Sequence, residues 1–144
     1  MKVKEREMFL TATNFLASAD FCYNAKDSFY RGFNTPIIVS YSLACEIYLK
    51  LLLLNQGLKN TKTHNINKLY QKLTDDRKNY IEIQLLNNGH GLKDAFGINQ
   101  IEKIFEYFIK WRYCYEHSNL MGNISFIKTL ADILREICRG IVFI

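Results

Sequence analysis

Arg112 and His117 are the two side chains of this sequence whose types and spacing could do chemistry together. A guanidinium neutralises charge on a phosphate or a carboxylate, and an imidazole exchanges a proton near neutral pH. Their spacing places them about 140° apart around an ideal helix. They can therefore share one site only if the helix ends near Glu116 or if a second copy of the chain supplies one of them. Alternatively, His117 is an exposed histidine at a helix end, where the helix dipole favours it.

Arg112 continues an apolar stripe, and this position demands an anion. The stripe consists of Ile101, Phe105 and Phe108. A guanidinium on such a face is costly unless an anion contacts it. The anion is either a ligand phosphate or a carboxylate of this chain, and the candidate carboxylates are Glu116, four residues later, and Glu46 in a very apolar segment. Glu46 could instead pair with Lys50, also at a spacing of four. A structural ion pair and a ligand site both remain open.

The cysteines and the other histidines carry weaker signals. Cys114 and His117 form C-x-x-H, but no second ligand pair follows the spacing of a zinc site, so we expect no metal and no cofactor. The four cysteines lie far apart without a C-x-x-C pair. The first residues are charged and lack the apolar core of a signal peptide. These features favour a reduced, cytoplasmic chain. We expect His64 to help start a helix rather than to catalyse.

The segments that must position these residues show the periodicity of α-helices in their apolar residues. This periodicity predicts helices over 4–30, 36–56, 61–73, 75–87, 98–116 and 124–142. In the first helix the buried stripe is expected to consist of Met8, Ala12, Phe15, Ala19 and Cys22. Thr35 and Thr74 are predicted N-caps, and Gly57 is a predicted helix stop. The chain is therefore expected to be an all-α antiparallel bundle of five to six helices.

Length and composition agree with one helical domain over residues 1–144. The chain has 144 residues, one Pro and seven Gly, too few turn formers for a sandwich or a barrel. Residues 37–54 are apolar enough for a membrane segment, but the charges of Glu46 and Lys50 favour a buried helix, and we expect no membrane association. The net charge of +5 permits an acidic partner such as RNA. A loosely basic stretch is interpreted as solvated surface; it consists of Lys59, Lys62, Lys68 and Lys72.

Three stretches together resemble one known family. Residues 112–117 fit the pattern R-x4-H, residues 42–53 read SLACEIYLKLLL, and residues 63–69 read THNINKL. These motifs are similar to those of the HEPN (higher eukaryotes and prokaryotes nucleotide-binding) domain family. The resemblance covers residues 37–118, and the helical order fits nearly the whole chain. It implies a helical bundle that dimerises, with the Arg and His of both protomers lining a cleft at the interface.

The resemblance implies a metal-independent endoribonuclease with a toxin or phage-defence role. His117 would be the general acid or base for attack of an RNA 2′-hydroxyl on the neighbouring phosphate. Arg112 would neutralise charge in the transition state. Glu116, Glu46 and Tyr113 would support this pair. The partners it implies are RNA or nucleotide, a second copy of the chain and a minimal nucleotidyltransferase as antitoxin.

A second interpretation concerns residues 111–116, which read W-R-Y-C-Y-E. They are similar to a W-R-Y-x-Y-E variant of small HEPN proteins in which the Arg and Glu define the pattern and the His is incidental. This variant implies a non-catalytic module that binds nucleotide, RNA or a protein partner. In a third interpretation Arg112 and Glu116 are purely structural, and the dimer is a scaffold.

Overall fold

A computed structural model describes residues 2–25, 34–59, 61–104 and 124–143 of the chain. Its helices are α1 (Lys2–Asn24), α2 (Asn34–Asn55), α3 (Ile66–Gln71), α4 (Asp75–Asn87) and α6 (Ile124–Val142). Residues 100–104 are also helical, and an isolated bridge pairs Lys93 with Asn99. The protein is all-α, as predicted.

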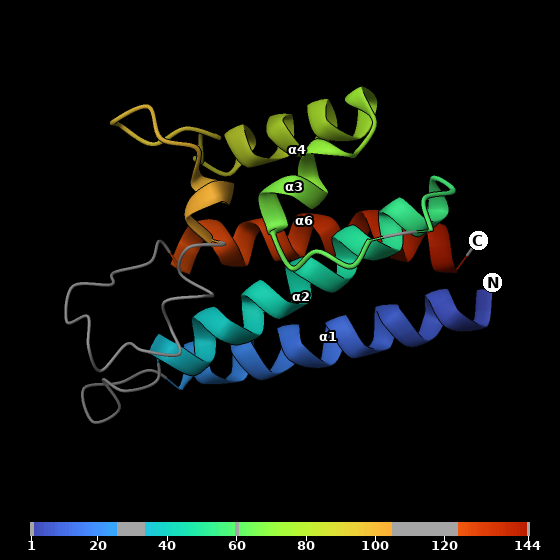
Figure 1. Cartoon of the computed structure of the whole chain (residues 1–144). Coiled ribbons are helices and arrows are strands. Elements are labelled where there is room, and N and C mark those ends of the chain that lie inside the picture. The colour runs from blue at the N-terminus through green and yellow to red at the C-terminus, as the bar shows by residue number, and fades with distance from the viewer. Residues whose placement is uncertain (1, 26–33, 60, 105–123, 144) are drawn as a thin grey trace.

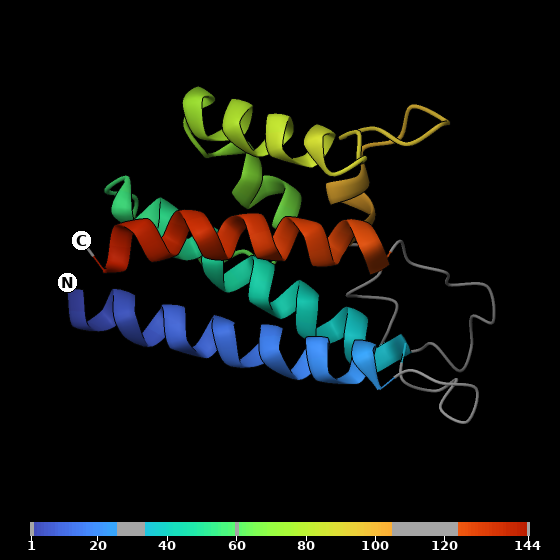
Figure 2. The same cartoon turned by 180° about the vertical axis from the view of Figure 1, so that it is seen from behind.

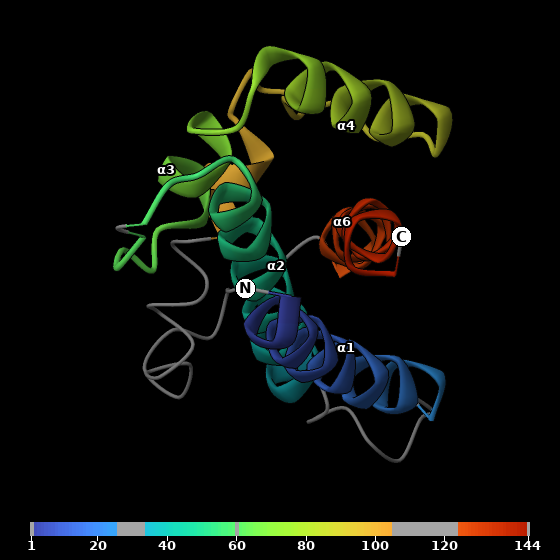
Figure 3. The same ribbon diagram turned by 90° about the vertical axis from the view of Figure 1, so that its right-hand side faces the viewer.

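Three long helices form the centre of the bundle. Figure 1 shows α1 antiparallel to α2 and α6 running in the same direction as α2. Figure 2, the view from behind, shows α6 crossing α2 at a shallow angle. α4 covers α6 on the side away from α1, and α3 lies beside α2 on the side away from α6 (Figure 3). The end of α1 and the beginnings of α2 and α6 lie together at the end of the bundle opposite the two chain termini (Figure 1).

α2 is the core helix. Tyr41, Tyr48 and Leu52 on this helix are fully buried. In the described part of the chain, the segment Pro36–Asn55 is the one helix long and apolar enough to cross a bilayer, with a mean hydropathy of 1.8. Within the protein, 67% of the most apolar 18-residue window of this segment is buried. Helices that are apolar all round are typical of protein cores as well as of membranes.

α1 buries a face that is displaced from the predicted one. The structure confirms Ala12 and Ala19 as buried, but Phe9 and Leu16 share the centre of the face with them. The other three predicted residues are half-buried at its edge: Met8, Phe15 and Cys22. Apolar residues flank the alanine line on both sides, so the sequence defines the centre of this face only to about one position. The predicted end at residue 30 lies outside the described residues, and the described helix ends at Asn24.

Local end signals explain most helix boundaries. α4 and α6 have the predicted bounds, and the Thr74 hydroxyl accepts a hydrogen bond from the Arg77 amide at 3.4 Å. Gly57 ends α2 with φ +87°, and the amide after it, on Leu58, donates to the Leu53 carbonyl at 3.0 Å. This is the left-handed C-terminal motif that glycine adopts without strain.

Two predicted helix starts were wrong. α2 begins at Asn34, so Thr35 is inside the helix rather than its cap. α3 is shorter than predicted because Asn65, not a residue near 61, is its N-cap and accepts from the Lys68 amide at 3.2 Å.

Candidate functional site

Four of the five predicted site residues lie outside the part of the chain that the structure describes. They are Arg112, Tyr113, Glu116 and His117. Of the apolar stripe that leads to Arg112, only Ile101 is described, and it is fully buried, as is Ile104. The placement of Arg112 and His117 relative to each other therefore stays a prediction.

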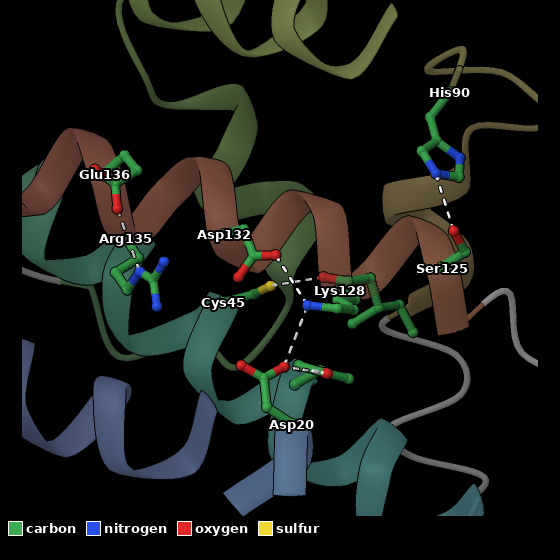
Figure 4. A network of polar contacts seen from close by, with 10 residues as sticks. Asp20, Cys45, His90, Ser125, Lys128, Asp132, Arg135 and Glu136 are labelled. Carbon is green, nitrogen blue, oxygen red and sulfur yellow. Dashed lines mark hydrogen bonds and ion pairs between the residues drawn. The ribbon is translucent and has the colours of Figure 1, made fainter. Parts of the chain in front are cut away.

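The two flanks of this segment are held by one turn. Before it, the Gln100 side chain donates to the Gly91 carbonyl at 2.7 Å, and its amide donates to the Leu92 carbonyl at 2.9 Å. After it, Ser125 Oγ lies 3.2 Å from His90 Nε2 (Figure 4). The His90 ring also meets Phe126 edge-to-face, with centroids 5.8 Å apart. Residues 90–92 thus contact both flanks, through Gln100 before the segment and through Ser125 and Phe126 after it.

Glu46, the fifth predicted residue, lies on α2 and is 7% exposed. Its carboxylate is 3.4 Å from Lys50 Nζ on the next turn of the same helix. The other carboxylate oxygen is 3.2 Å from Nδ1 of His64, whose side chain is 70% exposed. The pairing with Lys50 is one of the alternatives that the sequence left open. Any approach of Arg112 to this carboxylate falls outside the described residues.

We expected His64 to help start a helix, and it directly precedes Asn65, the N-cap of α3, without being the cap itself. Asn65 provides the cap, and Thr63 Oγ1 accepts from the Asn65 amide at 3.1 Å. The imidazole of His64 instead reaches the Glu46 carboxylate. No local signal could reveal this contact, because 18 residues separate the two side chains. Together they make a carboxylate–imidazole pair at the surface of the core helix, an arrangement that can hold and transfer a proton.

A second polar cluster joins α1, α2 and α6. Lys128 Nζ donates to Asp20 at 3.3 Å and to Asp132 at 3.1 Å (Figure 4). The buried Tyr41 hydroxyl donates to the same Asp20 oxygen at 2.5 Å. Sequence reasoning missed this cluster. Its only local signal is the spacing of four between Lys128 and Asp132, since Asp20 lies 108 residues away from Lys128.

The pKa shifts of Tyr41 and Lys128 indicate that this cluster holds the helices together rather than transferring protons. Burial raises the pKa of Tyr41 far above its usual range, and the hydrogen bond to Asp20 and its charge add to the effect. Burial lowers the pKa of Lys128, but hydrogen bonds and charges from Asp132 and Asp20 outweigh it and raise the pKa. Tyr41 therefore stays a donor and Lys128 stays cationic near neutral pH.

Among the described residues, Cys45 and Cys138 are fully buried and are poor nucleophiles. Cys45 Sγ is 4.0 Å from the Ile127 carbonyl, and Cys138 Sγ is 3.6 Å from the Tyr48 carbonyl. Burial raises the pKa of both thiols well above their usual range. A thiol that stays protonated neither attacks substrates nor binds metals well. Among the described residues, no three His, Cys, Asp or Glu side chains gather to hold a metal ion.

Comparison with known proteins gives one match. The family model of the HEPN domain matches residues 13–141, which includes α2, α3, α4 and residues 112–117. No curated protein and no solved structure matches the chain significantly.

Proposed function

The chain belongs to the HEPN domain family, and on this premise we propose that it is a metal-independent endoribonuclease. HEPN domains often bind RNA or dimerise. The observation that carries the proposal is that the family match over residues 13–141 contains the R-x4-H pattern of Arg112 and His117. Cleavage of a phosphodiester requires a cationic group and a group that transfers a proton. Arg112 and His117 would supply these two groups.

The proposed reaction is an internal transesterification. The RNA 2′-hydroxyl loses its proton and attacks the adjacent phosphorus, and the bond to the 5′ oxygen of the next nucleotide breaks. His117 accepts the proton or donates one to the departing oxygen. Arg112 stabilises the charge that develops on the phosphate oxygens. The products are a 2′,3′-cyclic phosphate and a 5′-hydroxyl.

A homodimer would complete this site. One ideal helix directs Arg112 and His117 about 140° apart, whereas two protomers can direct these side chains into one cleft. We propose Glu116, Glu46 and Tyr113 as supporting residues of the cleft. The carboxylate of Glu46 on α2 is buried and contacts the imidazole of His64. These polar groups support the proposal that Glu46 belongs to the cleft. In the cell we place the protein in the cytoplasm, as a toxin or phage-defence nuclease with a nucleotidyltransferase as candidate antitoxin.

A second candidate function is a non-catalytic module that binds nucleotide, RNA or a protein partner. It is favoured by the W-R-Y-C-Y-E sequence of residues 111–116, in which Glu116 follows Arg112 by four residues and can neutralise it. The chemistry of the RNA ends separates the two functions. RNA incubated with the protein in EDTA should acquire 2′,3′-cyclic phosphate ends, which polynucleotide kinase phosphatase activity removes. RNA that binds but stays intact would favour the non-catalytic module.

A further inference from the structure

The positive charge of this chain is concentrated in one short segment. Residues 59–72 contain four lysines and neither Asp nor Glu. Of the 19 basic residues in the chain, the remaining 15 face 14 acidic ones, so the rest of the chain carries a net charge of only +1 against +5 for the whole. We call these four residues the basic face: Lys59, Lys62, Lys68 and Lys72.

The fold presents the basic face to solvent. All four lysines are exposed, and the segment that carries them lies beside α2, on the side away from α6 (Figure 3). α3 is anchored from beneath by Ile66, Leu69 and Tyr70, which are at most 1% exposed. Lys68 lies in α3, and Lys72, four residues later, is the residue that caps the end of this helix. The amide side chain of Gln56 holds the end of the segment by donating to the Lys72 carbonyl at 3.2 Å.

Four lysines elsewhere in the described part of the chain contact acids, whereas Lys4 and Lys93 are exposed and, like the basic face, have no recorded carboxylate contact. Lys50, Lys78, Lys103 and Lys128 each contact a carboxylate. The structure records no such contact for the four lysines of the basic face within the described residues. Glu46, the acid that contacts this segment through His64, is buried and already paired with Lys50. The acids that follow this segment in the sequence are Asp75 and Asp76, which are exposed at the beginning of α4, and Asp75 contacts Lys78.

We propose that the basic face binds the phosphate backbone of RNA and holds the substrate of the proposed nuclease. The inference rests on the proposed function for the identity of the polyanion. Lysines together with hydroxyl and amide side chains supply most contacts to nucleic-acid backbones, and this segment also carries Thr61, Asn67 and Gln71. A bilayer surface is disfavoured, since Leu58 is the one exposed large apolar residue in residues 58–72.

Binding of an uncleavable RNA tests this inference independently of catalysis. The probe is a fluorescein-labelled, unstructured 20-nucleotide RNA with 2′-O-methyl groups, which lacks the attacking hydroxyl. The face variant is Lys59→Gln, Lys62→Gln, Lys68→Gln and Lys72→Gln combined. The matched control removes the same charge elsewhere, by Lys4→Gln, Arg6→Gln, Lys93→Gln and Arg139→Gln. Circular dichroism and urea midpoints verify that both variants are folded.

The expected result is a selective loss in the face variant. Single-stranded binding should lose a salt-dependence slope of about 0.7 for each phosphate contact removed, so the slope should fall by about 2 to 3 and Kd at low salt should rise at least about tenfold. The control should change both quantities far less. Equal losses in the two variants would overturn the proposal, as would binding of phosphatidylserine vesicles but not RNA.

The binding and cleavage results together distinguish failure of the proposed nuclease from failure of the proposal for the basic face. Selective RNA binding through the face, without cleavage of an unmodified RNA by the wild-type protein, would support the face and count against the nuclease. If the wild-type protein cleaves unmodified RNA, and wild type and face variant bind the probe with equal affinity, the result would support the nuclease and count against the basic face. A wild-type protein that binds no RNA overturns both.

Discussion

Asp94 shows how one side chain shapes the turn before the helical residues 100–104. Its Oδ1 accepts from the amides of Phe96 at 2.9 Å and Ile98 at 3.0 Å, and its other oxygen contacts Lys103 Nζ. The hydrogen bond from Lys103 is the largest cause that lowers the pKa of Asp94, and the two backbone amides add to it. These contacts therefore favour the ionised form of the carboxylate.

The pH dependence of stability should report this carboxylate. Because the folded pKa of Asp94 is below its unfolded value of about 4, its stabilisation is complete above that value and is lost as pH falls through the folded pKa. Asp94→Asn keeps the Oδ1 acceptor but removes the charge. Urea midpoints measured between about pH 6 and about pH 2.5 should therefore fall less in Asp94→Asn than in wild type.

The control for this experiment is Glu7→Gln, which removes a carboxylate charge from an exposed position on α1. Its acid-induced loss of stability should match that of wild type. An Asp94→Asn variant that loses as much stability as wild type on acidification would contradict the assigned role of the carboxylate.

At the scale of elements, Arg77 joins the beginning of α4 to the end of α2. Its guanidinium donates to the Leu52 carbonyl at 3.0 Å, to the Gln56 side chain at 3.1 Å and to the Asn55 side chain at 2.6 Å. The Leu52 carbonyl also accepts from the Gln56 amide at 3.0 Å, and it lies in the last turn of α2, where a cation meets the negative end of the helix dipole. α4 is thus docked by one forked side chain in addition to its apolar contacts.

Arg77→Ala should lower the free energy of unfolding by about 1.5–3 kcal/mol, because it removes charge-assisted hydrogen bonds to partly buried oxygens. Arg77→Lys should recover only part of this, since an ammonium lacks the planar fork. Urea unfolding followed by circular dichroism gives both values. Arg139→Ala, whose side chain is 55% exposed, is the matched control and should change stability little. Equal effects of Arg77→Ala and Arg139→Ala would rule out the docking role.

The elements that the sequence predicted best have strong local end signals. α4 lies between the Thr74 cap and the turn at Gly89, and α6 has a regular apolar face, so both were located correctly. The predicted centre of the buried face of α1 was wrong because apolar residues flank both sides of Ala12 and Ala19. The start of α3 was wrong because several polar residues in 61–65 can cap a helix, and the sequence does not choose among them.

The same distinction between local and distant contacts explains what was predicted of the site. The pairing of Glu46 with Lys50 follows from a helical spacing of four. The contacts of Glu46 with His64 and of Asp20 with Lys128 join different elements, and only the packing of those elements reveals them. Arg112 and His117 were predicted from the apolar stripe and from the family-like motif, and both their role and their geometry stay predictions.

At the scale of the whole molecule, we propose that two copies of the chain form the site together. Sedimentation equilibrium at micromolar concentration should give a species of twice the 16.9-kDa chain mass. A purely monomeric protein that still cleaves RNA would contradict the shared cleft, because one ideal helix does not direct Arg112 and His117 to one point. The extent of the domain, predicted as residues 1–144, stays a prediction beside the family match over 13–141.

The most direct test of the central claim is RNA cleavage in EDTA by wild type, Arg112→Ala and His117→Ala, each purified identically and verified to be folded. Lys93→Ala, an exposed substitution outside the proposed site, serves as the control. We predict that wild type and Lys93→Ala cleave, leaving 2′,3′-cyclic phosphate ends, and that both site variants lose cleavage by at least about 100-fold, as expected for loss of acid–base or charge-stabilising groups. Cleavage that persists unchanged in folded His117→Ala, or no cleavage by wild type on several RNAs, would contradict the account.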